Sequence, residues 1–147
     1  MRISLMVKTK RMDKLEYISG DLVMVKKSAL QFAKDKIFKV ISSLSGGFLK
    51  VVMLNDSSTT YSISNNAIRP IPLTPEILEK NGWKNDGYDW YRLPTKRAYL
   101  YITKDITTLG EFLVCVGLDR HNLASINFVH QLQHLLFGLG INSEMEV

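Results

Sequence analysis

The chain has 147 residues, of which 46% are apolar and 22% charged, with 19 Lys and Arg against 14 Asp and Glu. This size corresponds to one ordinary domain or two very small ones, and the composition excludes both a disordered tail and a membrane protein. The single cysteine, Cys115, excludes an intramolecular disulfide and a cysteine-rich zinc site. Because Cys115 lies in an apolar, strand-like run, we expect it to be a small buried hydrophobic residue.

The positive charge is concentrated in the first third of the chain. Residues 1–50 carry a net charge of +7, residues 51–100 a net charge of +1, and residues 101–147 a net charge of −3. The apolar runs fall far short of the roughly 20 residues that a membrane-spanning helix needs, and the first residues do not resemble a signal peptide. We therefore expect an intracellular protein that does not contact a membrane.

Residues 19–73 read as a series of short strands separated by Gly and Asn turns. Because five strands in about 55 residues must hide their edges, this pattern favours a small closed barrel. We therefore predict a small SH3-like β-barrel, with a basic N-terminal segment, over residues 1–73. Its predicted strands are Asp21–Lys26, Ile37–Leu44, Phe48–Leu54, Thr59–Ile63 and Ala67–Ile71.

A helix is predicted just after the proline-rich boundary of this barrel. Thr74 is a good N-cap residue and Pro75 a good first helical residue. The pair Asn81–Gly82 is a C-terminal stop signal. The helix would open a second domain, residues 74–147.

Three strands and a final helix are predicted after it. The strands are Tyr88–Leu93, Arg97–Thr103 and Glu111–Val116, and the helix runs from about Ser125 to Leu139. The second domain is thus an α-β-β-β-α module with an antiparallel sheet, and the whole chain is α+β. The apolar stripe of the last helix contains Phe128, Val129, Leu132, Leu135, Leu136 and Leu139.

Two histidines on the last helix have the spacing found in zinc metalloproteases. His130 and His134 are four residues apart, but Gln131 stands where those enzymes carry the glutamate that acts as general base. We therefore expect no metal, no cofactor and no enzymatic activity. A helical wheel places Asn127, His130, His134 and Phe137 opposite the apolar stripe, on a polar, solvent-facing side. The presence of Phe137 there makes a partner-binding surface the alternative interpretation.

Aromatic and basic residues alternate in the predicted strand Arg97–Thr103. Tyr99 and Tyr101 point to one face of that strand, and Leu100 and Ile102 point to the other. If the aliphatic pair faces the core, the tyrosines and Arg97 line the outer face, where aromatic rings beside cations can stack on nucleobases. Cross-strand aromatic pairs that only stabilise the sheet are the commoner case.

The basic residues of the first domain form a second candidate surface for nucleic acid. Such a patch can contact phosphates, although a lysine-rich surface with irregular spacing is also typical of a simply solvated face. The candidates are Lys8, Lys10, Arg11, Lys14, Lys26, Lys27, Lys34, Lys36 and Lys39.

Two segments of the chain resemble a group of small proteins. These are the run IRPIPLTPEILEKNGW at residues 68–83 and the run VHQLQ at residues 129–133. They are similar to segments of small uncharacterised proteins of Bacteroidetes phages and integrated elements, which carry an Ile-Pro-Leu-Thr-Pro-Glu-Ile-Leu run ending in Asn-Gly and an aromatic residue, and a late Val-His-x-Leu-Gln helix. The resemblance spans roughly residues 66–140. It implies a mobile-element setting in the cytoplasm of a bacterial host, and it implies no activity or catalytic residue.

Together these patterns lead to two hypotheses. The first is a non-enzymatic accessory binding protein of a phage or mobile element that contacts nucleic acid, or a nucleic-acid-processing complex, through its basic first third. The alternative is a protein-interaction or anti-defence factor that binds a host or phage protein. It would use the face of Asn127, His130, His134 and Phe137, or the tyrosine-bearing strands. The sequence leaves the identity of the partner and the oligomeric state open.

Overall fold

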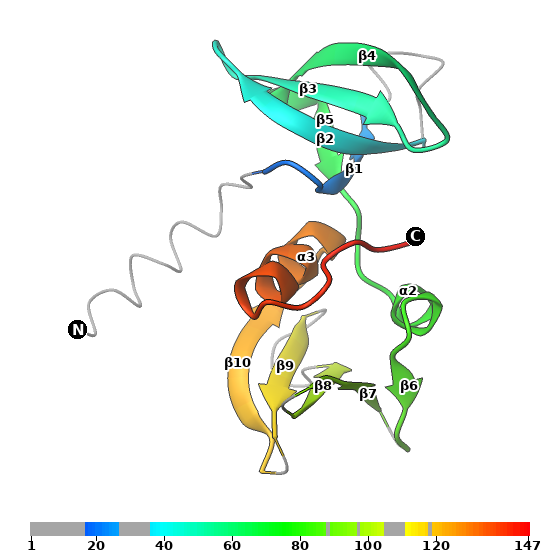
Figure 1. Ribbon diagram of the computed structural model, residues 1–147, viewed down its shortest axis with the longest axis vertical. Coiled ribbons are helices and arrows are strands. Elements are labelled where there is room, and N and C mark those ends of the chain that lie inside the picture. Colours follow the sequence, from blue (N-terminus) through cyan, green and yellow to red (C-terminus); the bar gives the residue numbers. More distant parts are fainter. Residues whose placement is uncertain (1–16, 27–35, 88, 97, 105–110, 118) are drawn as a thin grey trace, which may run out of the picture. The chain divides into compact units, whose positions relative to one another are not determined.

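The computed structural model describes residues 17–26, 36–87, 89–96, 98–104, 111–117 and 119–147. The chain divides into two compact units, Met1–Pro70 and Ile71–Val147, and each unit contains one five-stranded antiparallel sheet (Figure 1). The fold is α+β, as expected. Residues 71–73, which the sequence analysis assigns to the first domain, belong to the second unit, where the Val129 amide donates to the Ile71 carbonyl at 2.9 Å.

The sheet of the first unit has the strand order β4-β3-β2-β1-β5. All five predicted strands are confirmed. The observed β4 starts earlier than predicted because Asp56 already pairs with Met53, which makes the turn between β3 and β4 tighter than expected. The elements are β1 (Leu22–Val25), β2 (Ile37–Leu44), β3 (Phe48–Met53), β4 (Asp56–Ser64), the 3-10 helix η2 (Asn65–Ala67) and β5 (Ile68–Pro70).

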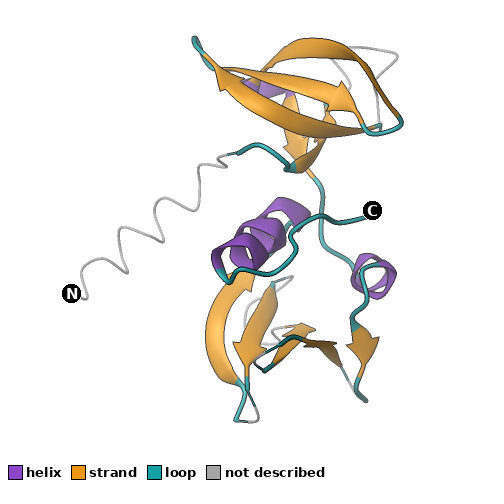
Figure 2. Cartoon of the chain, viewed as in Figure 1, coloured by secondary structure: helices purple, strands orange, loops and turns teal. Residues whose placement is uncertain are grey.

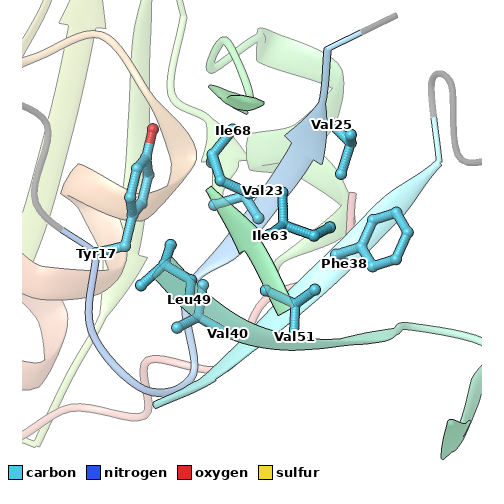
Figure 3. Packing of buried hydrophobic residues seen from close by; sticks show 9 residues of the cluster. All are labelled: Tyr17, Val23, Val25, Phe38, Val40, Leu49, Val51, Ile63 and Ile68. Atoms are coloured by element: carbon cyan, nitrogen blue, oxygen red, sulfur yellow. The ribbon is translucent and has the colours of Figure 1, made fainter. Parts of the chain in front are cut away.

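The core of the first unit is built from alternate residues of these strands. Leu49 and Val51 are buried whereas Lys50 between them is exposed, as the two-residue period of a strand requires. The turn from β2 to β3 uses Gly46 and Gly47 at φ +78° and +80°, a conformation that other residues rarely adopt. Figure 3 shows the buried cluster of Tyr17, Val23, Val25, Phe38, Val40, Leu49, Val51, Ile63 and Ile68.

The sheet of the second unit has the order β10-β9-β8-β7-β6. The three predicted strands are present, but the expected three-stranded sheet is wrong because two further strands extend it. One of them, β10, uses residues that lie partly in the predicted final helix and pairs along β9 instead. The strands are β6 (Lys84–Asn85), β7 (Trp90–Pro94), β8 (Tyr99–Lys104), β9 (Phe112–Val116) and β10 (His121–Ile126).

The first helix of this unit, α2 (Pro75–Lys80), begins and ends as its sequence predicts. The Thr74 side chain accepts a hydrogen bond from the Ile77 amide at 3.2 Å, which caps the amino end. At the other end, the Asn81 side-chain amide donates to the Ile77 carbonyl at 2.7 Å. Leu78 is completely buried and anchors the helix to the unit.

The second helix, α3 (Val129–Gly138), begins later than predicted because a side chain caps its start. The Gln131 side-chain carbonyl accepts hydrogen bonds from the amides of Asn127 and Phe128 at 2.7 and 3.1 Å. These amides have no partner within the helix itself, so the glutamine marks its first turn. The residues before Asn127 are therefore left to pair as β10.

Both helices lie on the same side of the second sheet (Figure 2). Leu100 and Ile102 of β8 are buried, with exposed fractions of 2% and 0%. We therefore assign them to this helix-covered side, as the sequence analysis expected of a core-facing pair. Among the described residues, no helix combines the length and the apolar character needed to cross a membrane.

Candidate nucleic-acid interface

The side of the second sheet opposite the helices carries aromatic and basic residues, and we call it the open face. Strand pairing aligns Lys84, Arg92, Tyr101 and Cys115 in one row across four strands. Directly paired residues point to the same side of a sheet, as do residues two apart on one strand. Trp90 and Tyr99 therefore share this face with the row.

Two arginines lie over the aromatic rings of the open face. The Arg120 Cζ lies 4.5 Å from the ring centroid of Trp90 and 4.6 Å from that of Tyr101. The Arg92 Cζ lies 4.9 Å from the ring centroid of Tyr99. All three distances fall within the ~6 Å at which a cation is attracted to an aromatic ring. We call these five residues the Arg-aromatic cluster.

The rings of the cluster also contact one another. Tyr101 meets Trp90 edge-on, with centroids 6.2 Å apart, and lies 6.3 Å from Tyr99 in a tilted arrangement. Edge-on and tilted pairs at such distances are favourable because of the charge distribution of the rings. The cluster is therefore continuous from Arg92 through Tyr99 and Tyr101 to Arg120.

The two tyrosines differ in accessibility. Tyr99 is 41% exposed, as the sequence analysis expected of an outward-facing ring, but Tyr101 is only 5% exposed. Tyr101 points outward as predicted, yet it lies in contact with Trp90, Tyr99 and the guanidinium of Arg120. Its ring is therefore covered, because Arg120 reaches it from the turn between β9 and β10, and its contact with Trp90 is of the sheet-stabilising kind that the sequence analysis gives as the commoner case.

One carboxylate faces both arginines of the cluster. Asp86, which follows β6, has Oδ1 at 3.9 Å from Arg92 Nη1 and Oδ2 at 3.7 Å from Arg120 Nη2. Both distances exceed the length of a good hydrogen bond, so the pairing is electrostatic and loose. Because two guanidiniums face one carboxylate, this group of charges is net positive.

Cys115 lies on the open face beside Tyr101 and is inert. Its side chain is buried, and its Sγ is 3.3 Å from Asn122 Oδ1. Burial raises the pKa of the thiol, and this effect exceeds the opposite influence of Arg120. The thiol therefore stays protonated near neutral pH, which makes it a poor nucleophile. The prediction of a buried Cys115 is confirmed.

Most of the basic residues named by the sequence analysis lie outside the described residues. These are Lys8, Lys10, Arg11, Lys14, Lys27, Lys34 and Arg97. Lys26 and Lys36 are described and exposed, at the end of β1 and just before β2, and Lys39 is half-buried on β2. Both exposed lysines belong to the first unit, whereas the tyrosines belong to the second.

The histidine face predicted on the last helix is not a single exposed surface. His130 is only 2% exposed, its ring stacked on Phe128 at 6.1 Å and meeting that of His134 edge-on at 5.5 Å. Asn127 and His134 are half-buried, and Phe137 is 69% exposed. The solvent-facing position predicted for His130 is therefore wrong.

The C-terminal segment is bonded to α3 through Gln133, which is buried like His130. The Gln133 side chain, one turn from His130, donates a hydrogen bond to the Ser143 carbonyl at 3.2 Å. The same segment is held by Asn81, whose side chain exchanges two hydrogen bonds with the backbone of Glu146, at 2.7 and 2.8 Å. Within the described ranges, no group of three or more His, Cys, Asp or Glu is arranged to hold a metal ion.

Sequence reasoning found part of the Arg-aromatic cluster. Tyr99 and Tyr101 were predicted from strand alternation. Arg92 and Trp90 had a signal as well, because they lie in the run YDWYR, where aromatic and charged residues are interleaved. Arg120 had no such signal, because it lies in the turn between β9 and β10, far along the chain from β7 and β8, which carry the rings that it contacts. No model of a known protein family and no curated protein matches the chain, so the functional argument depends on these residues.

Proposed function

We propose that the chain is a non-enzymatic accessory protein of a phage or mobile element that binds nucleic acid, alone or within a nucleic-acid-processing complex, through the open face. The Arg-aromatic cluster is the observation that carries this proposal. Sheet faces that bear aromatic rings can stack on bases, while nearby arginines supply planar groups and positive charge. The mobile-element setting rests on the resemblance of residues 68–83 and 129–133 to phage-encoded proteins.

The first unit would add non-specific contacts as a small SH3-like barrel. Two observations support this fold: the order β4-β3-β2-β1-β5, in which the last strand returns to pair with the first, and the 3-10 helix between β4 and β5. The exposed side chains of Lys26 and Lys36 would contact phosphates. Such contacts strengthen binding but do not read sequence.

Binding of a labelled oligonucleotide tests the proposal. We expect the chain to raise the fluorescence anisotropy of single-stranded oligothymidylate at roughly 50 mM salt, where phosphate contacts are strong. Replacing Tyr99 with alanine removes the exposed ring and should cost about 1–3 kcal/mol of binding free energy, the usual value of one base–aromatic stack. Because Tyr99 is 41% exposed, we expect the fold to survive the change.

The matched control is Tyr99→Phe, which keeps the ring and should bind like the wild type. Circular dichroism of both variants checks that the sheet is intact. If the wild-type chain binds neither single-stranded nor duplex DNA or RNA at this salt concentration, the proposed function is wrong.

A second candidate function, a protein-interaction or anti-defence factor, is favoured by one observation. Phe137 on α3 is 69% exposed. Aromatic side chains are enriched at protein–protein interfaces, so a ring exposed to this degree is a candidate contact for a partner. His130 would not take part, since it is buried.

Co-purification from the bacterial host tests this candidate. A partner that is lost with Phe137→Ala and retained with Phe48→Ala, which removes a 42% exposed ring from the first unit, would support it. Identical sets of partners for the wild type and both variants would count against this surface.

A further inference from the structure

The position of Asp86 marks a place on the open face where an anion fits. Its two carboxylate oxygens face two different guanidiniums, at 3.9 Å from Arg92 and 3.7 Å from Arg120. The side chain of Asp86 is 29% exposed, so solvent and ligands can reach this place. The carboxylate therefore occupies a site framed by two positive groups at the protein surface.

Both arginines are held in place by aromatic rings, not by the carboxylate alone. Arg120 lies over the rings of Trp90 and Tyr101, and Arg92 lies over the ring of Tyr99. Such contacts do not use all five N–H donors of a guanidinium, and Arg92 Nη1 and Arg120 Nη2 are the nitrogens that face Asp86. At 3.7 and 3.9 Å, Asp86 does not form tight hydrogen bonds with those groups.

A phosphodiester has the properties that this place requires. Like a carboxylate, it presents two oxygens that share one negative charge, and arginine N–H groups bind such oxygen pairs well. The exposed ring of Tyr99, which contacts Arg92, lies within reach of a base attached to that phosphate. Only an unpaired base can stack there, because the bases of a duplex are already stacked on each other.

We propose that the open face binds single-stranded nucleic acid with a phosphate between Arg92 and Arg120, and that Asp86 is a built-in competitor which this phosphate displaces. The proposal rests on the proposed function and deepens it, because it names the strand class and the residue that weakens binding. Asp86 thus keeps affinity low and makes it depend on the ligand's negative charge.

The test is the affinity of the full chain for single-stranded oligothymidylate with Asp86→Asn. Removing the competing charge should tighten binding roughly 3- to 10-fold at about 50 mM salt, with a smaller gain at higher salt because salt screens the charges. The matched control is Asp89→Asn, which removes an exposed acid from the same hairpin and should have little effect. A duplex of mixed sequence should bind more weakly than the single strand to all three proteins.

Two further variants test whether Asp86 affects binding through Arg92 and Arg120. Arg120→Lys keeps the positive charge but loses the planar group, and should weaken binding. Adding Asp86→Asn to Arg92→Ala should give a smaller gain than in the wild-type background, because one of the two groups that hold the phosphate is gone.

Failures of the two proposals can be told apart. If the wild type binds single strands but Asp86→Asn leaves affinity unchanged or lowers it, the competitor role is wrong and the proposed function stands. Duplex binding equal to or tighter than single-strand binding overturns the assignment of strand class. If no nucleic acid binds to the wild type or to any variant, both proposals fail.

Discussion

At the scale of single residues, Tyr17 shows how burial changes chemistry in the first unit. Its side chain is 7% exposed within the core cluster. Burial raises the pKa of its phenol to about 12, and the carboxylate of Asp21 adds to the rise. Asp21 is itself buried and accepts a hydrogen bond from the Ile18 amide at 2.8 Å. The phenol is therefore neutral in the folded protein well beyond pH 10.

This pKa predicts how stability falls in alkali. In the unfolded chain the phenol ionises near pH 10, whereas in the folded chain it ionises near pH 12. Between these values the unfolded state binds fewer protons than the folded state, so the free energy of unfolding falls as pH rises. Ionisation of this phenol should cost the wild type on the order of 2 kcal/mol of its free energy of unfolding over this window. Tyr17→Phe, which has no phenol at this position, should not show that loss.

Urea unfolding of the wild type and Tyr17→Phe from pH 9 to pH 12 measures the difference. The lysines titrate in both proteins, so their contribution cancels in the comparison. Parallel stability curves for the two proteins over this range would contradict the raised pKa.

At the scale of elements, the ends of the helices are decided by single side chains. Gln131 occupies the position where a zinc metalloprotease carries its catalytic glutamate. Here its side-chain carbonyl accepts hydrogen bonds from the amides of Asn127 and Phe128 instead. The spacing that resembles a catalytic motif is thus part of the start of a helix. At α2 the corresponding cap is the side chain of Thr74, which accepts a hydrogen bond from the Ile77 amide.

The cap of α2 gives a prediction at this scale. Thr74→Ala leaves the Ile77 amide without the hydroxyl acceptor, and should lower the free energy of unfolding by about 1 kcal/mol. Thr74→Ser keeps the hydroxyl and should stay close to the wild type. Urea denaturation followed by circular dichroism compares the three proteins. Equal losses for the alanine and serine variants would show that the cap is not the cause.

At the scale of the whole molecule, the excess of positive charge and the Arg-aromatic cluster belong to different units. The net charge of +7 over residues 1–50 falls within Met1–Pro70, whereas the Arg-aromatic cluster falls within Ile71–Val147. If the proposed function holds, the first would attract any nucleic acid by charge, and the second would select unpaired bases by stacking. Affinity and strand preference would then be separable by mutation.

Replacing Lys26 and Lys36 together with alanine tests the contribution of charge. If these exposed lysines bind phosphates, affinity should fall equally for all base compositions. The slope of log affinity against log salt should also shrink by about 0.7 for each phosphate of a single strand that the variant no longer neutralises. The matched control is Lys80→Ala with Lys104→Ala, which removes two exposed lysines from the second unit. Equal slopes for the wild type and the Lys26/Lys36 variant would exclude a role for these two lysines.

Much of the fold could be predicted because its signals are local. The strands of the first unit end at Gly and Asn turns, and α2 lies between Thr74 and Asn81, so neighbouring residues alone decide where these elements begin and end. Strand alternation likewise placed Tyr99 and Tyr101 on the face opposite Leu100 and Ile102. Two-residue periodicity and helix caps depend only on the nearby chain.

The remaining features depend on segments that are distant in sequence. Tyr101 is covered because Arg120 reaches it from another turn, and Gln133 is buried in part because it bonds to the C-terminal segment. Asp86 faces two arginines only once β6, β7 and the turn before β10 have come together. The sequence by itself determined the α+β class, the strands of the first unit, α2 and the outward side of β8. Only the tertiary structure decided which side chains remain accessible, because accessibility depends on what packs over a residue and not on its neighbours in the chain.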